Sequence, residues 1–435
     1  MNYTYKQLWH INLPVMMSIL MEQLINITDA IFLGNVGEVE LGASAIASIY
    51  YLALYMLGFG FSIGLQIMVA RKNGEQKYKE TGKIFFQGLF FLSGLAVFIC
   101  LSIHLISPFL LKPMIHSQEI YQAVISYLKW RSFGLLFSFP FLAMRSFFVG
   151  ITETKTLIWA AGISVLVNIA LNIILIFGLR LGISGAAIAS SLAEGSALVV
   201  LSAYMRRKTD KLHYGLKPAF HKQTLTDILK LSIWSMLHTF ISVFPWFIFF
   251  IAIEHLGKEE LAISNITRSV STAFFVIVNS FALTTGSLVS NAVGAGNTKA
   301  LFPICKKTLQ LGYILGIPLI GLMLFEKQRI IGLYTNNAQL IQSAFTPFII
   351  MLLNYTFALP GYVYLNAVNG IGKTKAAFIF QVTTTIVYLF YLYWLNSHTQ
   401  AGLAIYLTAE YLFVIMLWIQ SGIYLRKKSF NTSKL

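Results

Sequence analysis

The chain has 435 residues, of which 57% are hydrophobic and only 11% are charged, and its mean hydropathy is +0.71. An ordinary soluble chain is about 25% charged, so this composition excludes a water-soluble fold and predicts an all-α integral membrane protein with lipid as its solvent. The net charge of +16 does not indicate a nucleic-acid partner, because the basic residues gather in the segments between apolar runs.

Apolar runs predict six membrane spans in each half of the chain. In the first half they lie near residues 11–34, 42–70, 84–108, 121–147, 156–178 and 182–205. In the second half they lie near residues 226–256, 261–292, 303–325, 340–368, 376–396 and 400–425. The predicted domains are an N-terminal six-helix lobe at 1–205, a cytoplasmic linker at 206–224, a C-terminal six-helix lobe at 225–425 and a basic cytoplasmic tail at 426–435.

The basic residues also predict the orientation of the spans. Cytoplasmic segments of membrane proteins carry an excess of Lys and Arg, and one set of alternate segments holds most of them here, Arg145 and Lys155 included. The other set keeps only Lys112, Arg180, Lys258, Lys327 and Arg329. We therefore expect both termini in the cytoplasm of a bacterium, with the first span inserting into the inner membrane without a removable signal peptide.

The second half of the chain repeats the first with an offset of 220 residues. Matching pairs are Gly37 and Gly257, Pro140 and Pro360, Gly150 and Gly370, Thr154 and Thr374, and Gly182 and Gly402. Because each half has an even number of spans, the two halves are parallel repeats related by an axis along the membrane normal. Transporters built in this way place a binding site between the repeats near the bilayer midplane.

Acidic residues inside the predicted spans are the clearest functional signal in the sequence. An ionised carboxylate at the bilayer centre costs about 2.5–3.5 kcal/mol on insertion scales, so such residues mark ion or substrate pathways. Glu22 and Asp29 lie nearly two turns apart on the first span, about 10 Å along one face of a helix. A carboxyl group in an apolar environment can load and release a proton near physiological pH. A Na⁺ ion can replace that proton where enough oxygens converge.

Polar side chains on the fifth and sixth spans can surround such a carboxylate. Asn168 and Asn172 are one turn apart and face the same way, and Ser190 and Glu194 are one turn apart on the next span. Two amides and a hydroxyl can exchange hydrogen-bond partners when a carboxylate binds a proton. The alternative is that they only join helices, at about 0.6 kcal/mol for each contact.

The second half has few interior charges. Glu254 ends the seventh span, Glu410 lies in the twelfth, and Arg268 is the buried cation expected in the eighth. Arg268 can pair with an acid or meet an anionic substrate, and the sequence leaves both open. The residues predicted to bind a cation or proton are therefore Asp29, Glu22, Asn168, Asn172 and Ser190, with Glu194 and Arg268 as accessory residues.

Signatures of enzymes and cofactors are missing from the sequence. No P-loop is present, so we expect an H⁺ or Na⁺ gradient rather than ATP to supply the energy. The eight His residues show no metal-ligand spacing, and Cys100 and Cys305 offer no disulfide framework. We therefore expect no enzymatic activity, no catalytic residues, no cofactor and no resident metal.

Three stretches of the sequence are specific in their order and spacing. They are Asp29-Ala-Ile-Phe-Leu-Gly34, then Pro140-x4-Arg145-x4-Gly150-x3-Thr154-Lys155, then Asn168-x3-Asn172 with Gly185-Ala-Ala-Ile-Ala-Ser190. Together they resemble the multidrug and toxic compound extrusion (MATE) transporters, and the likeness spans nearly the whole chain. The resemblance implies a V-shaped pair of six-helix lobes and antiport of a substrate against H⁺ or Na⁺.

The resemblance also implies roles for residues of the first half. In family members with an ion site in the N-terminal lobe, an Asp of the first span is central, and Asp29 matches it. Asn168 and Asn172 match two accompanying positions of the fifth span, and Ser190 matches a Thr of the sixth. An Asp often stands where this chain has Asn172, and a Gln where it has Glu22. We therefore expect Glu22 to take over part of the missing acid's role.

Another branch of the family uses acids in the seventh and tenth spans, and these positions correspond to the uncharged Ser242 and Ala358. Ion coupling is therefore expected in the N-terminal lobe. The predicted function is a monomeric secondary active antiporter that exports small organic, amphipathic or cationic compounds across the cytoplasmic membrane. The alternative is a flippase for a lipid-linked precursor from the same superfamily. A flippase is expected to have a cleft rich in basic residues, whereas Arg268 is nearly alone.

Overall fold

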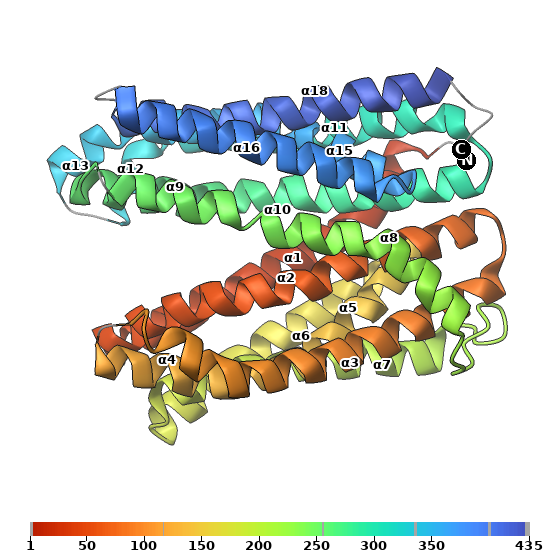
Figure 1. Cartoon of the computed structure of the whole chain (residues 1–435), viewed down its shortest axis with the longest axis horizontal. Helices are drawn as coiled ribbons and strands as arrows, with labels where there is room; N and C mark the ends of the chain where they lie inside the picture. Colours follow the sequence, from red (N-terminus) through yellow and green to blue (C-terminus); the bar gives the residue numbers. More distant parts are fainter. Residues whose placement is uncertain (1–2, 116, 255, 335–336, 399–401, 431–435) are drawn as a thin grey trace. The chain divides into compact units, whose positions relative to one another are not determined.

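The computed structural model describes residues 3–115, 117–254, 256–334, 337–398 and 402–430. Throughout these ranges the chain forms helices and connecting turns without a strand (Figure 1). Eleven helical segments of the described residues are long and apolar enough to cross a membrane. The predicted class of all-α integral membrane protein is therefore confirmed.

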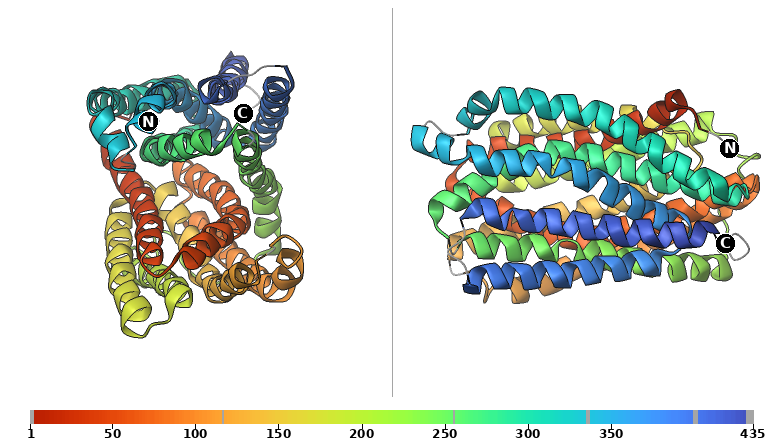
Figure 2. Two further views of the ribbon diagram at one scale, coloured as in Figure 1. Left: turned by 90° about the vertical axis from the view of Figure 1, so that its left-hand side faces the viewer. Right: turned by 90° about the horizontal axis from the view of Figure 1, so that it is seen from above.

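The helices form two compact units. Residues Leu13–Met236 make one, which we call the N-terminal unit, and Met1–Asn12 together with Leu237–Leu435 make the C-terminal unit. Two helices therefore contribute residues to both units, α1 (Tyr5–Gly34) and α8 (Lys222–Ile241). Figure 2 shows the same helices along their axes and from above.

Within the N-terminal unit the helices correspond to the predicted spans. They are most of α1, α2 (Glu38–Gly74), α3 (Tyr78–Leu111), α4 (Gln118–Arg131), η1 (Ser132–Gly134), α5 (Leu135–Gly150), α6 (Lys155–Asn172), η2 (Ile173–Gly178) and α7 (Gly182–Lys208). The 3₁₀ turn η1 joins α4 to α5 within one predicted span, and α6 continues directly into the π-helical segment η2. These two irregular segments lie in the helices that carry the predicted site.

The C-terminal unit contains the remaining helices. They are α9 (Phe244–Glu254), α10 (Lys258–Gly294), η3 (Thr298–Ala300), α11 (Leu301–Phe325), α12 (Lys327–Gly332), α13 (Ala338–Ser343), α14 (Phe345–Leu353), α15 (Tyr355–Gly370), α16 (Thr374–His398), α17 (Leu403–Tyr406) and α18 (Thr408–Phe430). The start of α1 is fixed within this unit by side-chain hydrogen bonds. Thr284 Oγ1 donates to Asn12 Oδ1 at 2.9 Å, and Tyr5 Oη donates to Gln310 Oε1 at 2.6 Å.

The seventh predicted span, 226–256, is not one continuous helix. The helix α8 ends at Ile241, and α9 begins at Phe244 after two turn residues. Pro245 explains the break, because proline lacks an N–H and its ring clashes with the carbonyl four residues earlier, which belongs to Ile241. The tenth predicted span is likewise divided, into α13, α14 and α15.

The linker between α7 and α8 packs closely on the start of α3. The backbone N–H of Gly82 donates to the Tyr214 carbonyl at 3.0 Å, and Gln87 Nε2 donates to the Ala219 carbonyl at 2.7 Å. A Cβ at position 82 would lie 2.3 Å from the Tyr214 oxygen. Only glycine therefore allows this approach, and the polar segment is held against the helices of the N-terminal unit.

Candidate functional site

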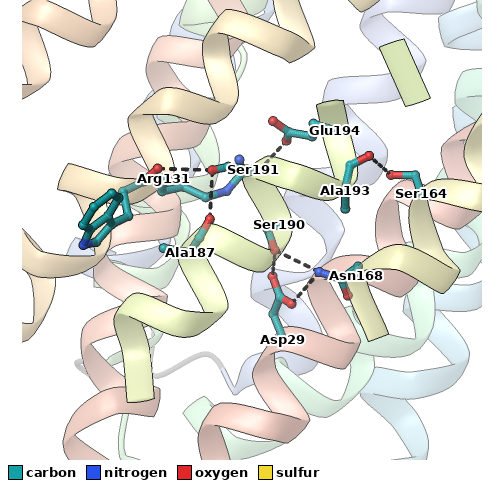
Figure 3. A network of polar contacts seen from close by, with 10 residues as sticks. Asp29, Arg131, Ser164, Asn168, Ala187, Ser190, Ser191, Ala193 and Glu194 are labelled. Carbon is teal, nitrogen blue, oxygen red and sulfur yellow. Dashed lines mark hydrogen bonds and ion pairs between the residues drawn. The ribbon is translucent and has the colours of Figure 1, made fainter. Parts of the chain in front are cut away.

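Four polar side chains meet inside the N-terminal unit, and Figure 3 shows Asp29, Asn168 and Ser190 of this group. Asp29 comes from α1, Asn168 and Asn172 from α6, and Ser190 from α7. Asp29 Oδ1 accepts hydrogen bonds from Asn168 Nδ2 at 3.0 Å and from Asn172 Nδ2 at 2.7 Å. Asp29 Oδ2 accepts one from Ser190 Oγ, which itself accepts from Asn168 Nδ2 at 3.0 Å. The structure thus brings together four of the five residues predicted to bind a cation.

This cluster, which we call the Asp29 cluster, is buried. Asp29 is 7% exposed, Asn168 and Asn172 are 0% exposed and Ser190 is 1% exposed. A buried carboxylate is tolerated only when it is paired or well hydrogen-bonded, and three donors meet that need here. Among the described residues, Asn172 Oδ1 has no hydrogen-bond partner. One amide oxygen of the described residues around Asp29 is therefore buried without a hydrogen-bond partner.

The packing of α6 against α7 positions the cluster. Asn168 and Asn172 are one turn apart and therefore share a face of α6. The π-helical segment η2 follows Asn172 directly, and such segments occur frequently at functional sites. A Cβ at Gly185 would lie 3.0 Å from the Leu175 carbonyl, so the glycine allows α7 to approach η2 closely. This approach places Ser190 within reach of Asn168.

Beside the Asp29 cluster, α4 and α7 are joined by a buried ion pair. Arg131 Nη2 donates to Glu194 Oε1 at 2.6 Å, and the two side chains are 11% and 21% exposed. The Arg131 guanidinium also lies over the Tyr51 ring, 4.3 Å from its centre. Arg131 and Glu194 both interact electrostatically with Asp29. The predicted accessory residue Glu194 therefore belongs to the same region, held by an arginine to which the sequence assigned no role (Figure 3).

Glu22 forms a second ion pair rather than joining the Asp29 cluster. Its Oε1 accepts from Arg145 Nη1 at 3.1 Å, and the Glu22 side chain is 40% exposed while that of Arg145 is 6% exposed. Arg145 lies inside α5, because a carboxylate from α1 compensates its charge, as a buried guanidinium requires.

Together these groups carry an unbalanced charge. The carboxylates are those of Asp29, Glu22 and Glu194, and the guanidiniums are those of Arg131 and Arg145. With every group ionised, the sum is one negative charge. An uncompensated charge in a low-dielectric interior costs several kcal/mol. One monovalent cation, either a proton on a carboxyl group or a Na⁺ ion, makes the network neutral.

The other predicted accessory residue, Arg268, belongs to the C-terminal unit. It lies in α10, and its charge interacts with that of Glu410 in α18. Ser242, which the resemblance aligns with an acid of the seventh span, lies in the turn between α8 and α9 and donates to the Thr239 carbonyl at 2.7 Å. The two accessory residues therefore belong to different units.

Comparison with known sequences places the chain in a family. A sequence model of the MatE family matches residues 14–174 and again residues 235–395. The two matches cover most of the chain and fall one in each half, in agreement with the internal repeat. The chain belongs to the MatE family.

Curated relatives of the chain are named for drug resistance and extrusion. The multidrug resistance protein NorM of Vibrio cholerae is 22% identical over 338 residues, which cover 76% of this chain and 74% of that protein. The multidrug and toxin extrusion protein 1 of Danio rerio is 24% identical over 334 residues, covering 75% of this chain and 56% of that protein. The match thus spans little more than half of the Danio rerio relative. Members of this family are transporters rather than enzymes.

Solved structures show the same fold. The structure of an outward-facing multidrug resistance MATE family transporter has a TM-score of 0.92 and 18% identity, covering 99% of this chain and 97% of that chain. A eukaryotic MATE transporter has a TM-score of 0.84 and 17% identity, covering 98% of this chain and 97% of that chain. The predicted MATE-like fold is therefore confirmed.

Proposed function

We propose that this chain is a secondary active antiporter that exports small organic compounds, amphipathic or cationic, in exchange for H⁺ or Na⁺ bound at Asp29. The observation that carries the proposal is a buried carboxylate with three hydrogen-bond donors in a network one positive charge short of neutrality. Intramembrane carboxylates mark ion pathways. The drug-resistance names of the relatives support the substrate class.

Binding of a proton would change the contacts between three helices. A proton added to Asp29 Oδ2 forms an O–H group that donates to Ser190 Oγ. The Ser190 hydroxyl, which donates to Asp29 in the structure, must then turn to another acceptor. The bonds from Asn168 and Asn172 also weaken, because hydrogen bonds to a charged group are worth about 1.5–3 kcal/mol and those to a neutral group about 1 kcal/mol. The contacts of α1 with α6 and α7 thus have two states, which ion binding selects.

The direction of the hydrogen bonds favours H⁺ over Na⁺. Asn168, Asn172 and Ser190 all direct donor atoms towards Asp29, and this is how an ionised carboxylate is satisfied without a metal ion. A Na⁺ ion needs several oxygens directed to one point, so both amides would have to rotate. A proton needs only the carboxylate and one acceptor, and Ser190 Oγ supplies the acceptor.

Transport into liposomes tests the proposal. Purified protein is reconstituted, and ethidium movement is followed under a pH gradient alone and under a Na⁺ gradient alone. We expect the pH gradient to drive ethidium accumulation. The variant Asp29→Asn should accumulate less ethidium. Asp227→Asn is its matched control, because it makes the same chemical change at a carboxylate whose side chain is 48% exposed.

Each other outcome has a definite meaning. Accumulation under the Na⁺ gradient alone would replace H⁺ by Na⁺ as the coupling ion. Failure of both gradients to drive the dye would contradict antiport. Movement of a fluorescent lipid-linked sugar between leaflets, with no dye transport, would favour a flippase instead.

The distribution of Lys and Arg supports a bacterial inner-membrane location with both termini in the cytoplasm. We expect a C-terminal epitope tag to be cleaved by added protease in inverted vesicles and protected in intact spheroplasts. The reverse result would contradict this orientation. We also expect a monomer, and light scattering in detergent measures its mass.

A further inference from the structure

A second buried polar pair lies in the C-terminal unit, between α16 and α18. Tyr388 Oη donates a hydrogen bond to Glu410 Oε1 at 2.9 Å. Tyr388 is 1% exposed, and its ring packs edge-to-face against Phe413 with centres 5.6 Å apart. Glu410 is partly buried. A carboxylate within a membrane-spanning helix is expensive and therefore usually functional, yet the Asp29 cluster makes no use of this one.

The internal repeat relates this pair to the Asp29 cluster. With the offset of 220 residues, Tyr388 corresponds to Asn168 and Glu410 corresponds to Ser190. These are two of the three positions that donate hydrogen bonds to Asp29 in the first repeat. The counterpart of Asp29 itself is Phe249, which is 6% exposed. The second repeat therefore keeps a polar pair at the same place but carries its carboxylate on the last span instead of the first.

Groups from the neighbouring helices complete the surroundings of Glu410. The charged and titratable groups that interact with it among the described residues are Arg268 of α10, Tyr362 of α15 and Tyr388 of α16. Arg268 interacts with the ionised carboxylate, and because it is only partly buried, its charge stays partly accessible to solvent when Glu410 binds a proton. The groups around Glu410 thus comprise one carboxylate, two phenolic hydroxyls and one positive charge. This set suits a proton, which needs one carboxylate oxygen and one acceptor, better than a metal cation, which needs several oxygens.

We propose that Glu410 and Tyr388 form a second proton-binding site, in the C-terminal unit, and this proposal rests on the proposed antiport function. A proton adds to Glu410 Oε1 and forms an O–H bond. The new hydroxyl donates to Tyr388 Oη, and the phenolic hydrogen turns to another acceptor. Release of the proton reverses these steps and restores the hydrogen bond in the structure, with no oxidation or reduction.

Infrared difference spectroscopy of the full-length protein tests the site without measuring transport. Spectra are recorded in detergent between acid and alkaline pH for wild type, Glu410→Gln and Asp29→Asn. We expect the carbonyl band of protonated carboxyl groups to lose one component in Glu410→Gln and a different component in Asp29→Asn. The control Glu259→Gln, at an exposed carboxylate in the first turn of α10, should remove only a component of a solvated carboxyl group and leave the components lost in Glu410→Gln and Asp29→Asn unchanged.

Tyr388→Phe keeps the aromatic ring and removes only the hydroxyl, so it is a second test if Glu410→Gln does not fold. In this variant the Glu410 component should shift in frequency, because its hydrogen-bond partner is gone. A carbonyl band that is the same in wild type, Glu410→Gln and Tyr388→Phe would overturn the proposal. That result would leave gradient-driven transport through Asp29 intact, whereas failure of all gradient-driven transport would overturn the antiport function without changing these spectra.

Discussion

Replacing Asp29 by Asn tests the charge balance of the N-terminal unit. The substitution keeps the size of the side chain and leaves one oxygen to accept from Asn168 and Asn172, but it removes the negative charge. The network then holds two carboxylates and two guanidiniums and is neutral without an added cation. Weakening of the charge-assisted hydrogen bonds costs about 1–2 kcal/mol each. Relief of the buried charge offsets this cost, so we expect the variant to fold.

The expected effect on transport follows from the single missing charge. One proton moving down a gradient of one pH unit releases about 1.4 kcal/mol, which corresponds to a tenfold concentration ratio. For each pH unit of gradient, exchange for one proton at Asp29 therefore raises the concentration ratio of a monovalent cationic dye across the membrane about tenfold. Under a gradient of one pH unit, Asp29→Asn should therefore lower this concentration ratio about tenfold, whether or not Glu410 also couples a proton to transport. The dye should still equilibrate across the membrane.

The assay measures the final ethidium ratio in liposomes under a fixed pH gradient, with the membrane potential held at zero by K⁺ and valinomycin. Asp227→Asn should keep the wild-type ratio. An Asp29→Asn variant that folds, transports and sustains the same dye ratio as wild type would refute both the charge balance and the role of Asp29.

Three other changes test the surroundings of the site. Glu194→Gln leaves the Arg131 guanidinium buried without an ionised partner, so the free energy of unfolding should fall by about 3 kcal/mol. Adding Arg131→Met to this variant should restore most of the loss. Unchanged thermal unfolding of Glu194→Gln would contradict the ion pair. Glu22→Gln leaves the buried Arg145 guanidinium without an ionised partner, so it should also lower the stability, but by less than Glu194→Gln because solvent reaches the Glu22 side chain, which is 40% exposed. It also makes the network neutral without an added cation, so the dye ratio should fall about as far as in Asp29→Asn; a wild-type ratio would remove Glu22 from the charge balance. In the linker, the backbone N–H groups of His213 and Leu212 donate to Asp210 and lower the pKa of its carboxyl group. This stabilisation is present above about pH 4, the ordinary pKa range of Asp, and is lost as the pH falls through the lowered folded value. Protection of the His213 amide against hydrogen exchange, measured relative to its intrinsic exchange rate, should therefore fall in acid in the wild type, and Asp210→Asn should remove this dependence.

Hydropathy predicted the membrane class and the number of apolar runs in the first half because lipid imposes one constraint. Every backbone polar group within the bilayer must be satisfied inside its own segment, so each long apolar run becomes a helix. The same measure does not register local breaks. Pro245 stops α8 at Ile241 through steric clash and a missing donor, and neither effect changes the mean hydropathy of the run.

The polar residues of the site could be named from the sequence, but not all of their contacts could. Asp29, Asn168, Asn172 and Ser190 could be named from helical spacing and from the resemblance to a known family, and the structure places them together. Their role as ion ligands stays a prediction. Glu22 was expected to share their task, but its hydrogen bond goes to Arg145.

The sequence by itself determined the all-α membrane fold, the duplication and the identity of the acidic residues, because composition, periodicity and offset are properties of the chain read in order. Only the tertiary structure decided which charges are paired. Arg131 meets Glu194, and Tyr388 meets Glu410, because separate helices pack side by side. An ion pair between two helices depends on their rotation and axial position, and these are fixed by the packing of small residues such as Gly185. Hydropathy contains no record of that packing.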